Sequence, residues 1–205
     1  MRLIVVRHGE TAHNRDRVTL GRADVPLNDL GVKQAAAVAA SFASAPVAVY
    51  ASPLRRAVDT ASGIAAAHAL GVMVEPALIE MDVGELEHLG YADLREKYPE
   101  FLRAWMSADA ADARMPGGET LREVQERAWG AVARMREAHG DGDVVAVTHN
   151  FVALTIICAA LGLPLSRFRR VRQALAAKTV IEFGERGTVL AQLNDVSHLA
   201  AAGLG

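Results

Sequence analysis

Arg7, His8 and Gly9 stand directly after a short apolar run at residues 3–6. An apolar run of this length predicts a buried strand. Open α/β sheets bind ligands at the carboxyl ends of their strands, where these three residues would lie. An arginine offers a planar cationic fork to an anion, and an adjacent imidazole can attack through a ring nitrogen. The pair therefore predicts chemistry on a phosphoryl group.

Four later segments contain charged or histidine side chains beside predicted strands or helices. They are residues 52–61 with Arg56, residues 78–85 with Glu80, residues 116–120, and residues 147–149 with His149. Three of them follow predicted strands, and residues 116–120 precede a predicted long helix. Each segment alone is a weak signal, but together with the first they form a strong one.

In this order the five segments resemble the signatures of the histidine phosphatase superfamily, also called the phosphoglycerate mutase-like family. Residues 3–14 match its strand-R-H-G-E-T-x-x-N pattern, and residues 52–61 match S-x-L-x-R-A-x-x-T-A. Residues 78–85 resemble its L-x-E-x-x-x-G-E stretch, and residues 116–120 resemble its P-G-G-E-[ST] element. The resemblance extends to about residue 199 and implies a phosphatase or a phosphoglycerate mutase.

The resemblance also implies roles for individual residues. His8 would be the nucleophile that carries a phosphohistidine, and Glu80 would be the proton donor. The catalytic set would comprise Arg7, His8, Arg56, Glu80 and His149. The residues expected at the phosphate are Arg7, Asn14, Arg56, His149 and Asn150.

Elementary chemistry supports this division of work. A phosphomonoester carries nearly two negative charges, which two arginines would neutralise, and His149, if protonated, would add a third positive donor. His8 must be neutral at its attacking nitrogen, and a hydrogen bond from the other nitrogen to a carbonyl would hold that tautomer. A carboxylic acid such as Glu80 would protonate the leaving oxygen and later activate water. The arginines would take the electrostatic role of a metal, so we expect neither metal nor cofactor.

Three activities are compatible with the motifs. The favoured one is a metal-independent phosphatase for small phosphomonoesters. A phosphoglycerate mutase would use the same nucleophile, but mutases of the family carry a longer segment between the acid and the P-G-G-E element than residues 81–115 provide. A non-enzymatic binding module is the third, although such proteins usually lack the nucleophile or an arginine. α-Ribazole phosphate, sugar phosphates and phosphoglycerate derivatives are all candidate substrates.

Some positions leave the substrate open because they depart from the family pattern beside the motifs. These positions are Leu20, Leu86, His88 and Asn150. Glu10 would either order its loop or touch substrate, and His13 would face solvent or substrate. The basic stretch at residues 167–172 predicts a solvated or salt-bridged face, with an anionic partner as the alternative.

The elements that must position these residues alternate between strand and helix. Strands are expected at residues 47–51, 72–75 and 144–147, and helices at residues 30–44, 52–68, 120–139 and 151–161. Ser52 would cap its helix with Pro53 at the first position, and Thr120 with Glu123 forms a capping box. The alternation predicts a mostly parallel central sheet with helices on both faces, in one domain over residues 1–205. Residues 81–116 would be a small helical insertion, broken by Pro99, and residues 179–193 a terminal antiparallel hairpin.

Composition excludes several other classes of protein. The chain has 205 residues, of which 51% are hydrophobic and 22% charged, and its net charge is −2. No global basic field favours nucleic acid. The single cysteine, Cys158, cannot form an internal disulfide, and no apolar run has the length of a signal or membrane segment. We therefore expect a cytoplasmic protein that binds a small phosphorylated metabolite, with no nucleic acid or membrane partner. The family resemblance allows a homodimer.

Overall fold

Six segments rich in apolar and β-branched residues form one sheet in the order β3-β2-β4-β1-β5-β6. The computed structural model describes residues 1–204. The strands are β1 (Arg2–Arg7), β2 (Ala48–Ala51), β3 (Val72–Val74), β4 (Asp143–Thr148), β5 (Lys178–Gly184) and β6 (Gly187–Asp195). Strands β1 to β4 pair in parallel, whereas β5 runs antiparallel to both β1 and β6. The mostly parallel sheet and its terminal hairpin are confirmed.

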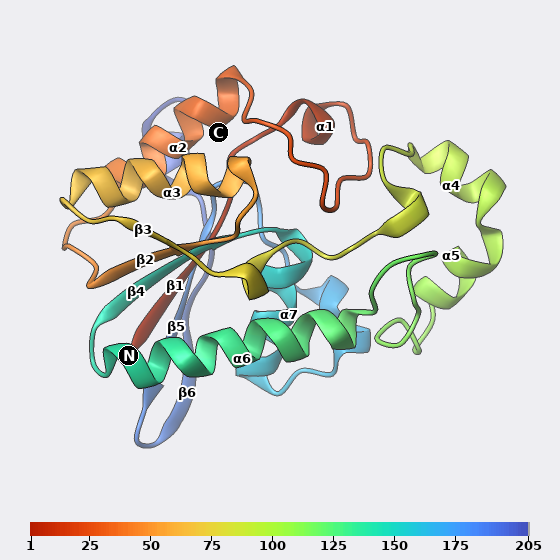
Figure 1. Ribbon diagram of the computed structural model, residues 1–205. Coiled ribbons are helices and arrows are strands. Elements are labelled where there is room, and N and C mark those ends of the chain that lie inside the picture. Colours follow the sequence, from red (N-terminus) through yellow and green to blue (C-terminus); the bar gives the residue numbers. More distant parts are fainter. Residues whose placement is uncertain (205) are drawn as a thin grey trace.

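The two faces of the sheet bury separate apolar clusters because side chains alternate along each strand. Leu3 and Val5 of β1 pack in a cluster with residues of α6 (Leu121–His139) and α7 (Asn150–Leu161). Ile4 and Val6 pack in the other cluster, with residues of α2 (Asp29–Ala40) and α3 (Arg55–Ala67). Figure 1 shows α2 and α3 on one side of the sheet and α6 on the other. Helices on both faces are thus confirmed.

Local signals set the ends of several helices, among them the predicted capping box of α6. Thr120 caps α6 in a capping box with Glu123, and Asn28 accepts a hydrogen bond from the Gly31 N–H at the start of α2. Helix α7 ends at Gly162, whose φ of 61° is left-handed and favours glycine. Helix α2 ends at Ala40, four residues before the expected end, because Ser41 closes its last turn onto the Val38 carbonyl.

The predicted cap of α3 is wrong. The helix begins at Arg55, not at Ser52, and Leu54 before it is extended. A distant carboxylate takes the capping role, because Asp24 Oδ1 accepts the Arg55 N–H at 2.7 Å. The Ser52 hydroxyl lies 2.7 Å from His149 Nε2. A long-range contact therefore overrides the local Ser-Pro signal.

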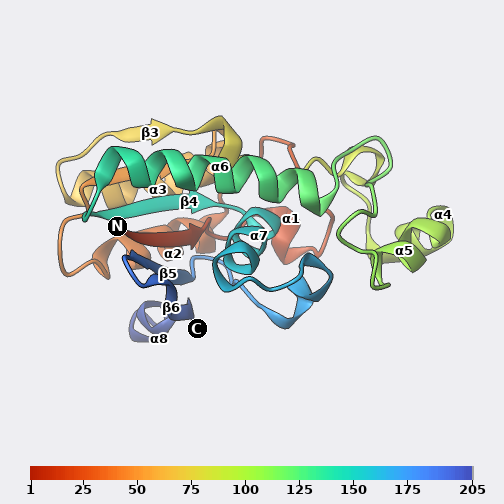
Figure 2. The same ribbon diagram turned by 90° about the horizontal axis from the view of Figure 1, so that it is seen from below.

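Residues 81–116 contain two short helices, α4 (Tyr91–Lys97) and α5 (Pro99–Trp105), separated by a break before Pro99 as expected. Single 3₁₀ turns lie nearby, at η1 (Pro76–Leu78) and η2 (Gly84–Leu86). Figures 1 and 2 both place α4 and α5 beyond the carboxyl end of β1. The remaining elements, which the sequence did not predict, are α1 (Ala12–Arg15), η3 (Leu165–Arg170) and α8 (Ser197–Ala201).

Within residues 1–204, no helix combines the length and the apolar character needed to cross a membrane.

Candidate active site

The carboxyl ends of β1 and β4 bring the two motif histidines together. The strands are parallel neighbours with Arg7 paired to Thr148, so His8 and His149 leave the sheet side by side. Their ring centroids are 5.0 Å apart, and both residues are buried. Side chains more than 140 positions apart in sequence thus share one site.

His8 has the tautomer that a nitrogen nucleophile requires. Its Nδ1 lies 2.7 Å from the carbonyl oxygen of Gly9, which can only accept, so Nδ1 carries the proton. Nε2 is then the atom with a free electron pair. Burial lowers the pKa of His8 well below its usual 6.5, and the charges of Arg56 and Arg7 lower it further. The ring is therefore neutral at pH 7.

A close backbone crossing explains the glycine after His8. A Cβ atom on Gly9 would lie 2.5 Å from the carbonyl oxygen of Gly31, in the first turn of α2. The Gly9 N–H donates to the Thr60 hydroxyl of α3 at 3.2 Å. Only glycine fits this crossing, which ties the loop after β1 to both helices on that face.

Arg56 is a buried cation held by backbone oxygens. Its Nη1 and Nη2 donate to the carbonyls of Ala23 and Gly21, both at 2.7 Å, and its Nε has no partner. Burial lowers its pKa, although the nearby Glu80 opposes this. The Glu87 carboxylate in turn accepts the N–H groups of residues 21–23 at 2.6–3.2 Å, so Glu87 shapes the loop that holds Arg56.

Arg7 is fixed from the opposite side. Its Nη1 donates to the Gln173 carbonyl at 2.8 Å and to Asn150 Oδ1 at 3.2 Å, while its buried Nε has no partner. Burial lowers its pKa to about 10, which leaves the guanidinium charged at pH 7. Asn150 therefore orients an arginine.

His149 does not meet the condition for a third positive donor. Burial lowers its pKa well below 6.5, and His8, Arg56 and Arg7 lower it further, so the ring is neutral. Its Nε2 lies 2.7 Å from Ser52 Oγ, and its buried Nδ1 has no partner. His149 in this structure thus contributes a neutral ring and no positive charge.

Glu80 is a buried carboxyl beside both arginines. Its Oε1 accepts the Met81 N–H at 2.8 Å, and its Oε2 accepts the Phe151 N–H at 3.3 Å. Burial raises the pKa of Glu80 and outweighs these hydrogen bonds and the charges of Arg56 and Arg7, which lower it. A carboxyl that keeps its proton to higher pH suits a general acid.

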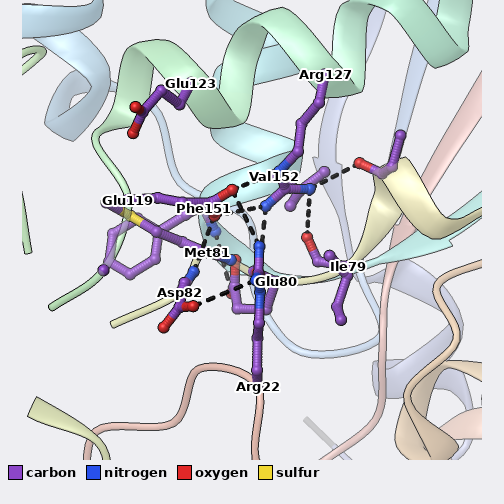
Figure 3. Close-up of polar contacts among 12 residues, drawn as sticks. Arg22, Ile79, Glu80, Met81, Asp82, Glu119, Glu123, Arg127, Phe151 and Val152 are labelled. Carbon is purple, nitrogen blue, oxygen red and sulfur yellow. Dashed lines mark hydrogen bonds and ion pairs between the residues drawn. The ribbon is translucent and has the colours of Figure 1, made fainter. Parts of the chain in front are cut away.

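Arg127 of α6 forms hydrogen bonds with the backbone of the segment that carries Glu80 (Figure 3). Its Nη1 donates to the carbonyls of Ala77 and Ile79, both at 2.7 Å, and its Nη2 donates to the Glu80 carbonyl at 3.2 Å. Nε and Nη2 also donate to the Glu119 carboxylate, each at 3.0 Å. These five contacts use all five N–H groups of the guanidinium.

Arg22 approaches the same segment from the first loop. Its Nε donates to the Glu80 carbonyl at 3.3 Å, and its Nη1 donates to Asp82 at 3.2 Å. Its Nη2 pairs with Glu119 at 3.0 Å, so this carboxylate lies between two arginines (Figure 3). The pKa of Glu119 is accordingly lowered. The P-G-G-E element thus supports the acid segment.

The other residues of the first loop have local partners. Asn14 Oδ1 accepts the N–H of Thr11 at 3.1 Å and its hydroxyl at 2.9 Å, in a capping box at α1. Glu10 accepts the side-chain amide of Asn28 at 2.8 Å. The side chains of His13 and His88 contact each other, with Nε2 and Nδ1 2.9 Å apart.

Four supporting residues were not identified from the sequence: Ser52, Thr60, Glu87 and Arg127. Ser52, Thr60 and Glu87 lie inside or beside the quoted motifs, but their partners are distant in sequence. Arg127 had a signal of its own, since it falls between Val124 and Ala131 on the buried face of α6. Charged residues are rarely placed on such a face without partners.

No group of three histidine, cysteine, aspartate or glutamate side chains in residues 1–204 is arranged to hold a metal ion.

Comparisons with known proteins identify one superfamily and several relatives. A model of the histidine phosphatase superfamily (branch 1) matches residues 3–196. Phosphoserine phosphatase 1 of Hydrogenobacter thermophilus is 34% identical over 97% of this chain and 94% of its own length. A probable phosphoglycerate mutase of Cronobacter sakazakii is 30% identical, covering 100% of this chain and 97% of its own. The solved structure of Bacillus stearothermophilus YhfR superimposes with a TM-score of 0.90 at 27% identity, over 97% of this chain and 98% of that one.

Proposed function

This chain belongs to the histidine phosphatase superfamily, branch 1, and we propose that it hydrolyses small phosphomonoesters through a phosphohistidine on His8. Its activity is that of a phosphomonoesterase. The observation that carries the proposal is a neutral His8 whose Nδ1 donates to Gly9, between two arginines with unpartnered Nε atoms. Buried donors without partners are costly, and phosphate oxygens would satisfy them.

Substrate binding uses the fixed cations. Arg7 and Arg56 each contact non-bridging oxygens of the phosphate, and His149 donates from its unpartnered Nδ1. Asn14 donates through its side-chain amide nitrogen. Asn150 takes part by holding Arg7, to which it is hydrogen-bonded. Two guanidinium charges balance the dianion in a site from which water is largely excluded.

The first chemical step transfers the phosphoryl group to the protein. Nε2 of His8 attacks phosphorus, the N–P bond forms and the P–O bond to the alcohol breaks. Glu80 gives its proton to the departing oxygen, so the alcohol leaves neutral and Glu80 becomes a carboxylate. General acid help of this kind is worth roughly 10²–10⁴-fold in rate.

The second step returns the protein to its starting state. The Glu80 carboxylate takes a proton from a water molecule whose oxygen attacks phosphorus. The N–P bond breaks, inorganic phosphate forms, and His8 recovers its electron pair. Glu80 is again protonated. The two arginines stabilise the charge on the phosphoryl oxygens in both steps, and no metal ion takes part.

The test combines a nucleophile variant with trapping of the intermediate. His8→Ala should lower p-nitrophenyl phosphate hydrolysis at least about 10³-fold, while His139→Ala, at the far end of α6, should leave it unchanged. Labelled phosphate should remain on wild-type protein after a rapid alkaline detergent quench, which preserves N–P bonds. If His8→Ala is as active as wild type, the proposal is wrong.

Phosphoglycerate mutase is the second candidate because a relative carries that name. A mutase must keep its phosphoenzyme away from water, and mutases of the family carry a longer segment at the position of α4 and α5 than this chain does. Interconversion of 3-phosphoglycerate and 2-phosphoglycerate should therefore be slow, with or without 2,3-bisphosphoglycerate. Rapid turnover that depends on the bisphosphate would reverse this ranking. Phosphoserine and α-ribazole phosphate are further substrates to test.

A further inference from the structure

A cavity of about 490 Å³ begins at the phosphate-binding arginine and extends to η3. Arg7 and Asn150 form its inner wall, Leu154 and Phe168 give it an apolar side, and Arg169 and Arg172 contribute positive charge. No aspartate or glutamate lines it. A cavity lined by apolar side chains and by positive charge is typical of a site for a small organic anion.

Within residues 1–204, the arginines at residues 167–172 are among those that have no acidic partner. Nine other arginines form ion pairs with carboxylates. Within the part of the chain that the structure describes, no ion pair is found for Arg167, Arg169, Arg170 or Arg172. The prediction for residues 167–172 is a solvated or salt-bridged face; the four arginines are exposed, as in a solvated face, and the salt-bridged form is not found among the described residues. Four uncompensated cations in six residues attract an anion instead.

Arg169 is held in place by neutral groups. Its guanidinium carbon lies 4.4 Å from the centre of the Phe168 ring and 5.3 Å from that of Trp105. Its Nη2 donates to the Trp105 carbonyl at 2.7 Å. Stacking of this kind leaves other N–H groups of the guanidinium free to donate. Because the Arg169 side chain is already ordered by neutral groups, little further side-chain entropy is lost when it binds an anion.

The cavity is connected to the reacting phosphate through Arg7. The Gln173 carbonyl and Asn150 Oδ1, which accept hydrogen bonds from Arg7 Nη1, both belong to residues of the cavity wall. Asn194, on the same wall, has its Oδ1 occupied by the Ala174 N–H at 2.6 Å. Its amide nitrogen then offers a further donor. The cavity and the proposed phosphate site therefore share Arg7.

We propose that this cavity receives the alcohol part of the substrate, and that this part carries its own anionic group, bound by Arg169 and Arg172. The shared chemistry is a carboxylate or a second phosphate on a short carbon skeleton. The inference rests on the proposed phosphatase function and adds the class of substrate. Phosphate esters of neutral alcohols are then the poorer substrates.

Two matched pairs of substrates test the proposal. 3-Phosphoglycerate and glycerol 3-phosphate differ by a carboxylate in place of a hydroxymethyl group. Fructose 1,6-bisphosphate and fructose 6-phosphate differ by a second phosphate. The wild-type protein should prefer the more anionic member of at least one pair by roughly 10–100-fold in kcat/KM, the effect of one or two charge-assisted hydrogen bonds. The pair that shows the preference identifies the anion.

Single substitutions test whether Arg169 and Arg172 cause the preference for the more anionic substrate. Arg172→Gln should reduce the ratio of kcat/KM within the preferred pair about tenfold or more, and Arg169→Gln should do the same. Arg186→Gln is the matched control, since Arg186 is exposed in the β5–β6 turn. It should leave the ratio unchanged. Arg172 is exposed, so its substitution should not affect folding, and a thermal melt checks this.

The outcomes separate this inference from the proposed function. Wild-type protein that hydrolyses p-nitrophenyl phosphate through His8 but has no preference within either pair would overturn the subsite alone. An equal preference in Arg172→Gln and in wild type would overturn the assignment to these arginines. Loss of His8-dependent hydrolysis would instead overturn the phosphatase proposal.

Discussion

At the scale of single residues, burial determines what each ionisable group can do. His8, Glu80 and His149 are all buried, and for each of them burial is the largest cause of the pKa shift. Burial disfavours the charged form, so it lowers the pKa of a histidine and raises that of a carboxyl. The same physical effect thus favours a neutral nucleophile and a carboxyl that keeps its proton to higher pH.

Glu80→Gln tests the acid. Hydrolysis of an alkyl ester such as phosphoserine should fall roughly 10²–10⁴-fold, because an alkoxide leaves slowly without a proton. Formation of the phosphoenzyme from p-nitrophenyl phosphate should fall much less, because nitrophenolate leaves without one. Glu85→Gln, an exposed neighbour on the same segment, is the control. Equal losses of the two phosphorylation rates, measured by rapid quench, would exclude the acid role.

The pH profile gives a second measurement for the same residue. kcat/KM for the alkyl ester should fall as pH rises through the raised pKa of Glu80, where the acid loses its proton. It should fall at low pH only below 6.5, where His8 becomes protonated. The fall at high pH should be absent in Glu80→Gln. If kcat/KM of Glu80→Gln still falls at high pH, a group other than Glu80 causes the fall.

At the scale of elements, α6 does more than cover the sheet. Arg127 of α6 donates hydrogen bonds to the carbonyls of residues 77, 79 and 80. Glu119, which lies just before α6, forms an ion pair with Arg22 of the first loop. The acid segment has little regular structure around Glu80, so side chains must fix its path. A helix that buries its apolar face against the sheet provides a rigid base for them.

We expect Arg127→Met to displace Glu80 while leaving His8 in place. A displacement of about 1 Å can reduce a rate about 10²-fold, and here the loss should be larger for an alkyl ester than for p-nitrophenyl phosphate. Arg134→Met, which removes an exposed arginine of the same helix, is the matched control. Arg127→Lys should recover only part of the activity, since an ammonium cannot make all five contacts. A loss that is identical for both substrates would point to a general effect on folding.

At the scale of the whole molecule, the site lies at the carboxyl ends of β1 and β4, where His8 and His149 are buried. Neutral histidines in such a place make the fold sensitive to acid. Their folded pKa lies below the unfolded value of 6.5, so between these values the unfolded chain binds more protons. Their stabilising contribution is complete above pH 6.5 and declines as pH falls. Glu80 acts in the opposite direction, since its folded pKa is raised.

The free energy of unfolding should therefore decrease from pH 7 to pH 5.5. Each proton taken up only by the unfolded chain contributes about 1.4 kcal/mol per pH unit, and two histidines outweigh one carboxyl. Urea denaturation at the two pH values measures this. His8→Gln should make the dependence shallower, whereas Glu80→Gln should make it steeper. A stability independent of pH in wild type would contradict the neutral histidines.

Much of the architecture followed from local patterns. The runs before Arg7 and His149 predicted strands, and Thr120 with Glu123 predicted the start of α6, because burial patterns and capping depend on neighbours in sequence. The cap of α3 failed because Asp24, distant in sequence, competes with Ser52. A local sequence pattern cannot show that a residue distant in sequence will cap the helix.

Motifs and periodicity are properties of the chain, so they were enough to predict the family, the mostly parallel sheet and the types of side chain at its loop ends. They could not predict the neutral state of His149, the contacts of Arg127 or the unpaired charges of Arg169 and Arg172. Each of these depends on burial and on distances between segments that are far apart in sequence, and these exist only once the chain has folded.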